Sequence, residues 1–207
     1  MNLKNILFIF LVLQFGGIHA ANRDKLSHLR TEKRIITMDK AIAPYFSIQI
    51  IALKLPPGEP SFFKNVDVAR EYPCDDGYVR YCMGQYNSFN EARKDISRIK
   101  ALGYEQAFVV DSRKFRIDGV GGYGSGKIDP NKTYTIQLSA FRFPVYLTHF
   151  KGIDNVMEFR MKDKIFRYTI GSYKGTIAKQ ELDKIKAKGY KDAFLVEFER
   201  YLPFKIE

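Results

Sequence analysis

Apolar and polar side chains alternate over residues 47–53, where Ile48 and Gln49 lie on opposite sides of the alternation. A period of two residues is typical of a β-strand that buries one face and turns the other away from the core. The stretch 135–141 repeats this alternation. Its polar side carries Thr135, Gln137 and Ser139, and it ends at Phe141.

A predicted hairpin and a predicted helix follow each of these strands. The hairpin turns are residues 75–77 (Asp-Asp-Gly) and 162–164 (Lys-Asp-Lys), and Asp and Gly tolerate the backbone angles of tight turns. Ser88 and Glu91 match a capping box, after which apolar residues follow at helical spacing until Gly103. A short closing strand ends each series. Each series therefore predicts a small antiparallel sheet with a helix on one face and the other face open.

The two series share an ordered set of motifs. Arg-Tyr-x-x-Gly-x-Tyr occurs at residues 80–86 and 167–173, and Gly-Tyr-x-x-Ala-Phe occurs at 103–108 and 189–194. An ordered match of this kind is hard to obtain by chance, so we infer a tandem duplication. We call the two series the first copy and the second copy.

The duplication predicts how the chain is organised. The first copy spans residues 44–113 and the second 133–200, with a Gly-rich linker at 114–132 and a tail at 201–207. The linker spells Gly-x-Gly-x-x-Gly, but Asp and Pro follow where a phosphate-binding helix would begin, which argues against a nucleotide site. Residues 21–43 form a basic lead segment. The sequence leaves open whether this segment is solvated or touches a partner.

Residues 1–20 predict a secretory signal peptide. Lys4 supplies a positive start, residues 6–13 are an unbroken apolar run, and small residues precede Ala21. The run is too short to span a bilayer. We therefore expect an exported, periplasmic protein with no transmembrane segment after signal cleavage.

The chain is basic, with a formal net charge of +11 at pH 7. A basic surface favours polyanionic partners such as anionic lipid or acidic polysaccharide. Export makes nucleic acid the least favoured of the polyanions, and we expect no nucleic-acid partner.

Residues with catalytic or metal-binding chemistry are sparse. The two cysteines, Cys74 and Cys82, leave two interpretations open: a disulfide across the hairpin or two separate thiols. His28 and His149 lie far apart in sequence and no Cys-x-x-Cys occurs, so we expect neither a metal nor a cofactor. No nucleophile–base set or carboxylate pair occurs in both copies, so we expect a protein that is not an enzyme.

The ordered motifs resemble the SPOR (sporulation-related) repeat. Both copies carry aromatic-x-Ile-Gln-x-x-Ala in the first strand, then the two motifs described above around a helix. The second copy is similar in particular to exported Bacteroidetes proteins, with Phe-Lys-Gly-Ile at 150–153, whereas the first copy departs with Phe-Lys-Asn-Val at 63–66. The resemblance implies two tandem ferredoxin-like or RNP-like SPOR domains. It also implies binding of peptide-stripped peptidoglycan strands on the open sheet faces.

In the SPOR family the first-strand Gln belongs to the ligand-binding face, which corresponds here to Gln49 and Gln137. Alternation along the hairpin places Arg80 and Arg167 on the same side. Guanidinium groups can bind the lactyl carboxylates of the glycan, and amides can bind its hydroxyls. The second copy has the more polar strand face, so we expect it to bind more tightly. The expected glycan-binding residues are Gln49, Arg80, Gln137, Ser139, Phe141 and Arg167.

Two functions of different classes follow from these features. The first is non-catalytic binding of peptidoglycan in the cell envelope, at places such as the division site where stripped glycan is exposed. The alternative is a protein-interaction subunit of an envelope secretion or division complex, which would use a sheet face or a free strand edge.

Overall fold

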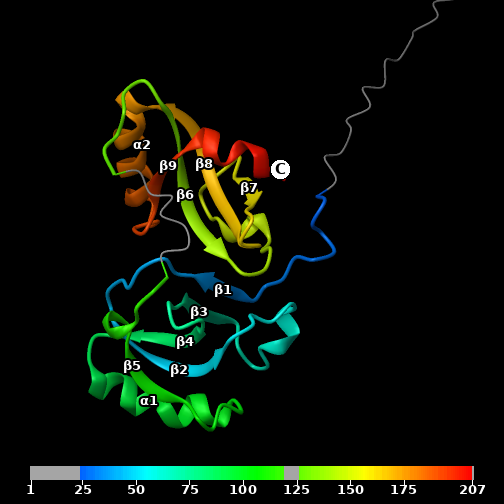
Figure 1. Ribbon diagram of the computed structural model, residues 1–207, viewed down its shortest axis with the longest axis vertical. Helices are drawn as coiled ribbons and strands as arrows, with labels where there is room; N and C mark the ends of the chain where they lie inside the picture. Colours follow the sequence, from blue (N-terminus) through cyan, green and yellow to red (C-terminus); the bar gives the residue numbers. More distant parts are fainter. Residues whose placement is uncertain (1–23, 119–125, 207) are drawn as a thin grey trace, which may run out of the picture.

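The computed structural model of this chain describes residues 24–118 and 126–206. The expected signal peptide and the central glycines of the linker lie outside the described residues. Within them, nine strands form one mixed sheet and two α-helices pack against it (Figure 1). The protein is therefore α+β, in agreement with the expected class.

The first copy is built around β2 (Phe46–Leu53), which lies between β5 (Phe108–Asp111) and β4 (Val79–Tyr86). β3 (Val68–Pro73) lies beyond β4, and all of these pairings are antiparallel. α1 (Phe89–Ala101) connects β4 to β5 and packs an apolar stripe against one sheet face. The predicted capping box at the start of this helix is present, with Ser88 Oγ accepting a hydrogen bond from the Glu91 N–H at 3.2 Å.

The second copy repeats this arrangement of strands. β6 (Thr133–Phe141) lies between β9 (Phe194–Glu197) and β8 (Phe166–Lys174), and β7 (Met157–Arg160) lies beyond β8. α2 (Gly175–Ala187) occupies the place of α1. The pairing order β9-β6-β8-β7 thus matches β5-β2-β4-β3. Short 3-10 helices lie at Pro60–Phe62, Ser112–Lys114, Leu147–His149, Phe198–Arg200 and Leu202–Phe204.

A strand from the lead segment joins the two copies. β1 (Arg34–Thr37) runs parallel to β3 and meets β6 in an antiparallel pairing of Ile36 with Phe141. The sequence predicted an antiparallel sheet in each copy, whereas β1 makes one continuous mixed sheet across both (Figure 1). This strand was missed because four residues between charged neighbours carry too little periodicity to predict a strand.

The recurring Gly-x-Tyr motif has a structural cause. Gly84 and Gly171 have φ angles of 70° and 69° and lie at the bulges where β4 and β8 slip against their partners. A Cβ atom at either position would collide with the ring of Tyr86 or Tyr173, which covers the glycine two residues before it. Glycine adopts such angles at little steric cost, and an aromatic ring can cover the exposed backbone.

The sheet face opposite α1 is covered. Met38 and Ile42 from the lead segment, together with Phe115 and Ile117 after β5, pack over this face of the first copy. Gln49 on the same face is only 9% exposed. The prediction of an open face is therefore wrong for the first copy, because apolar residues outside the repeat cover it.

The C-terminal segment covers the corresponding face of the second copy. Tyr201 is fully buried there and packs with Phe159 and Val196, while Phe198 and Phe204 lie at the edge of the same cluster. The prediction of an open face is wrong for this copy too. In both copies the second strand in chain order, β3 or β7, contributes apolar side chains to the face that the sequence assigned to ligand, among them Tyr72 and Phe159.

One buried carboxylate occurs at the same place in each copy. Glu71 in β3 and Glu158 in β7 both have 0% exposure, and each is paired across the ladder with a tyrosine. Arg142, just after β6, donates to Glu71 at 2.8 Å. Arg30 of the lead segment donates to Glu158 at 2.9 Å. Each carboxylate is therefore neutralised by an arginine from outside its own copy.

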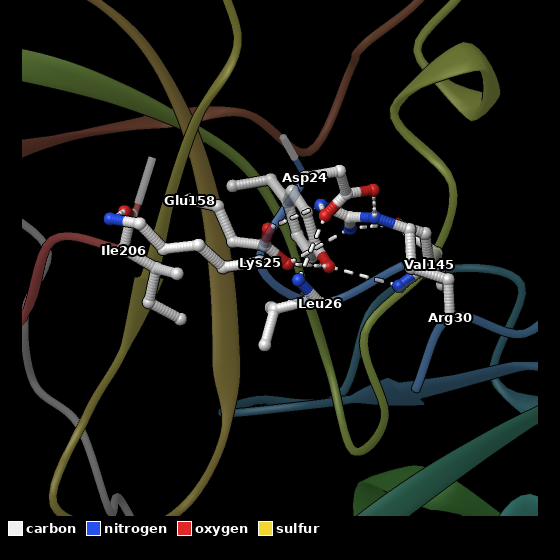
Figure 2. A network of polar contacts seen from close by, with 8 residues as sticks. Asp24, Lys25, Leu26, Arg30, Val145, Glu158 and Ile206 are labelled. Carbon is white, nitrogen blue, oxygen red and sulfur yellow. Dashed lines mark hydrogen bonds and ion pairs between the residues drawn. The ribbon is translucent and has the colours of Figure 1, made fainter. Parts of the chain in front are cut away.

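Arg30 is the centre of a buried polar network (Figure 2). Its guanidinium also donates to the Asp24 carboxylate and to the Val145 carbonyl, both at 2.5 Å. Burial alone would lower the pKa of Arg30, but its hydrogen bonds to Asp24 and Glu158 raise that pKa above the ordinary value. The lead segment is therefore an integral part of the fold and is held by charge as well as by strand pairing.

We expect Gly171→Ala to destabilise the protein more than Gly152→Ala. Gly152 has a similar φ of 71° but open space where a Cβ would lie, so its substitution tests backbone strain alone, about 1–2 kcal/mol. At Gly171 the Tyr173 ring must also move. Urea unfolding of the mature chain measures both costs, and equal costs would contradict the proposed role of the tyrosine.

We expect Arg30→Met to lower the free energy of unfolding by about 3–5 kcal/mol, because it removes the guanidinium that pairs with the buried Glu158 carboxylate. The control is Arg98→Met, which breaks an exposed pair with Asp95 on α1 and should cost less than about 1 kcal/mol. Adding Glu158→Gln to Arg30→Met should recover part of the loss. A cost no larger than that of the control would show that Arg30 does not stabilise Glu158.

Candidate functional site

Of the expected glycan-binding residues, Gln49 and Phe141 are buried, and Arg80 is engaged in an ion pair. Gln49 lies under the covering segments of the first copy. Phe141 is 1% exposed and packs on the helix side, with its ring edge-on to Tyr168 at 5.6 Å. Arg80 lies at the end of the hairpin and binds the turn residue Asp76 at 2.5 Å.

The hairpin turn explains why an arginine occurs at the same place in both copies, as Arg80 and Arg167. Arg167 binds Asp163 of its own turn at 2.6 Å, as Arg80 binds Asp76. Each arginine lies four residues after its aspartate. The hydrogen bond from Arg80 lowers the pKa of Asp76 to about 2. A structural role in the hairpin therefore accounts for both arginines, although Arg167 also reaches a cavity.

The other three expected residues, Gln137, Ser139 and Arg167, line one cavity of about 290 Å³. We call it the seam cavity. It lies between the copies, with walls from residues 36–42 of the lead segment, 137–140 of β6 and 189–194 before and within β9. Pairing with β9 extends along β6 to Gln137, and β1 meets β6 at Phe141. Ser139 therefore lies in the interval between these two neighbouring strands.

The polar groups of the seam cavity come from both copies and the lead segment. Gln137 is held in place by Tyr201, whose hydroxyl donates to its side-chain oxygen at 2.5 Å. Arg70 enters from β3 and donates to the side-chain oxygen of Gln85 at 2.6 Å. Burial lowers the pKa of Arg70, but a guanidinium group remains cationic at neutral pH. Two guanidinium groups, an amide and a hydroxyl thus converge on one space.

The balance of charge in the seam cavity is positive. Lys40 and Lys191 are exposed at its rim and add to Arg70 and Arg167, against the carboxylates of Asp39 and Asp192 in the lining and of Asp163, which pairs with Arg167. His149 lines the same space, and burial lowers its pKa, so its ring is predominantly neutral at pH 7. The cavity is therefore suited to an anionic ligand.

An aromatic ring completes the lining. Tyr190, from the Gly-Tyr motif, lies beside Gly189 in the wall. Its hydroxyl donates a hydrogen bond to the Lys151 carbonyl at 3.0 Å. Its ring is stacked at 6.5 Å on Phe150, which fixes its orientation. A fixed aromatic ring beside an amide and a hydroxyl can contact both the apolar and the polar edge of a sugar.

Sequence reasoning missed Arg70, Lys40 and Tyr190 as members of this site. Lys40 belongs to a lead segment whose position could not be derived from either copy, and Arg70 was on a strand with no assigned ligand role. A signal was present for the buried Glu71 and Glu158, because a glutamate recurs inside the corresponding short strand of both copies. Such recurrence indicates a partner cation.

Cys74 and Cys82 are buried free thiols, so the second of the two interpretations applies. Cys82 lies opposite Arg70 in the β3–β4 ladder, and Arg70 lies four positions before Cys74 along the chain. At about 3.3 Å per residue the cysteines are about 13 Å apart, beyond the roughly 7 Å that a disulfide spans. Burial raises the pKa of Cys82 to about 12 and that of Cys74 above its usual value, so neither is a reactive thiolate.

Within residues 24–118 and 126–206, no cluster of three or more His, Cys, Asp or Glu side chains is arranged to hold a metal. The helices in the same part of the chain are too short or too polar to cross a membrane. Comparison of the chain with protein-family models, with curated proteins and with solved structures finds no match.

Proposed function

We propose that this chain is a non-catalytic, periplasmic protein of the cell envelope that binds peptidoglycan glycan strands through the seam cavity. The proposal treats the two copies as SPOR-like repeats joined into one sheet by β1. The twofold occurrence of one strand order, with a helix at the same place in each, supports this interpretation. It moves the binding site from the sheet faces, which are covered, to the space between the copies.

The observation that carries the proposal is the convergence of Gln137, Ser139 and Arg167 on one cavity with the additional cation Arg70. A peptide-stripped glycan presents lactyl carboxylates at intervals and hydroxyls between them. Guanidinium groups bind carboxylates through charge-assisted hydrogen bonds, whereas an amide and a hydroxyl can bind to sugar hydroxyls as both donor and acceptor. The volume of about 290 Å³ is close to the lower end of ligand sites and suits one or two sugar units.

The test is co-sedimentation of the mature protein with purified sacculi, with and without prior amidase treatment to remove the peptides. We expect binding to both, stronger after amidase treatment, and weaker at high salt because the site is cationic. Absence of binding to either preparation would refute the proposal. Release of soluble fragments by the protein alone would refute its non-catalytic part.

The duplication supplies a matched pair of variants. Gln137→Leu removes an amide from the seam cavity, whereas Gln49→Leu removes the corresponding amide from the covered face of the first copy. Both amides are buried, so thermal unfolding of each variant controls for lost stability. We expect Gln137→Leu to weaken sacculus binding about tenfold and Gln49→Leu to leave it unchanged.

Filling the cavity tests the same site from another direction. Ser139→Leu adds bulk to its half-buried wall and should block ligand entry without removing a charge. Normal binding by both Ser139→Leu and Gln137→Leu would place the glycan site elsewhere on the protein.

A further inference from the structure

A second and larger hollow lies beside the lead segment. We call it the lead groove; its walls are residues 26–33, the loop 55–61, residues 142–144 and the β7–β8 hairpin, and its volume is about 1010 Å³. It shares no lining residue with the seam cavity. Figure 1 shows the blue lead segment and the cyan loop after β2 on the same, right-hand side of the sheet. A volume at the top of the usual range of about 300–1,000 Å³ suits an extended chain.

The lead groove is strongly basic. Glu59 is the one acidic residue among its described lining residues. The basic lining residues are His28, Arg30, Lys33, Arg142, Arg160 and Lys164. A concave surface with one sign of charge attracts a ligand of the opposite sign.

Several of these cations are already used within the fold. Arg30 and Arg142 neutralise the two buried carboxylates, and Lys33 donates to the Phe63 and Val66 carbonyls at 2.8 and 2.9 Å. Arg160 is exposed and lies over the Phe166 ring at 5.5 Å, and Lys164 is exposed in the turn. Within the described residues these two form no ion pair, so their charges remain for a ligand.

The lead groove also carries an exposed apolar side chain whose counterpart is buried. Leu55 in the first copy corresponds to Phe143 in the second, one residue before the proline shared by both. Phe143 is 5% exposed and inserts into the core of the first copy beside Phe63. Leu55 is 83% exposed. Exposure of a large apolar side chain in a concave surface is typical of a docking site.

The lining chemistry favours a peptide over a sugar. The exposed apolar groups are the aliphatic side chains of Leu55 and Leu29, at 83% and 49% exposure, next to the prolines of the loop. The two aromatic rings of the lining, Phe143 and Phe166, are 5% and 6% exposed, so neither offers a face for a sugar ring. Aliphatic side chains and prolines pack against apolar side chains of a peptide instead.

We propose that the lead groove binds an extended acidic peptide segment of a partner protein. Apolar side chains of the peptide pack on Leu55 and Leu29, and its carboxylates bind Arg160 and Lys164. This interaction surface is independent of glycan binding in the seam cavity, since the two sites share no residue.

The probe is a short fluorescein-labelled peptide that repeats Glu-Leu-Pro, in which proline favours an extended chain. Fluorescence anisotropy with the full mature chain measures binding. We expect binding that weakens with salt, together with much weaker binding of a Glu-Ser-Pro peptide and none of a Lys-Leu-Pro peptide. Equal binding of the acidic and the basic peptide, or of neither, would overturn the proposal.

Variants with matched controls locate the site. Lys164→Glu and Leu55→Ser should each weaken binding of the Glu-Leu-Pro peptide about tenfold. Lys94→Glu on α1 and Ile177→Ser on α2 make the same chemical changes at exposed positions outside the lead groove and should leave binding unchanged. Equal effects of groove and control variants would overturn the assignment.

The same variants separate this proposal from the proposed function. Loss of peptide binding with unchanged sacculus binding by Lys164→Glu and Leu55→Ser supports a peptide site. Loss of sacculus binding by these two variants, with normal peptide binding, would make the lead groove a glycan site and overturn the proposal. If Gln137→Leu leaves sacculus binding unchanged, the result contradicts a glycan site in the seam cavity and does not affect the proposed peptide site.

Discussion

The fold depends on the neutralisation of two fully buried carboxylates. Glu71 and Glu158 occupy the same place in the two copies, and each is paired with an arginine from outside its own copy. A carboxylate without a partner in a protein interior is very costly, so these two ion pairs stabilise the fold. Arg142 reaches back from the second copy into the first, and Arg30 reaches from the lead segment into the second. The lead segment and the two copies are therefore held together as one structure.

This constraint also determines which surfaces remain for ligands. Once the lead segment is held by Arg30 and β1, its following residues pack over the first copy, as the C-terminal segment packs over the second. The faces expected to bind glycan are thereby closed. Two concave surfaces, the seam cavity and the lead groove, lie where the lead segment meets the copies, and they use different residues. The two cavities differ in the chemistry of their lining residues.

Features governed by local chemistry could be predicted from the sequence. Strands β2 and β6, the capping box of α1 and the glycines after each helix follow from alternation, hydrogen bonding and backbone angle. The alternation also placed Gln49 and Gln137 on the face away from the helices. Exposure could not be predicted in this way, because it depends on segments that come close only in the folded chain. Tyr201 of the tail donates to Gln137 on the face of the second copy, and Phe143 of the second copy packs beside Phe63 of the first.

The sequence by itself determined the α+β class and most of the residues that form strands and helices, because these depend on patterns within about ten residues. The tertiary structure alone decided that β1 joins the copies, that both sheet faces are covered, and that Gln137, Ser139 and Arg167 share a cavity with Arg70. The physical reason is that strand pairing, burial of a sheet face and neutralisation of a buried charge depend on whichever segment comes close in space. The periodicity of the sequence does not show which segment that is.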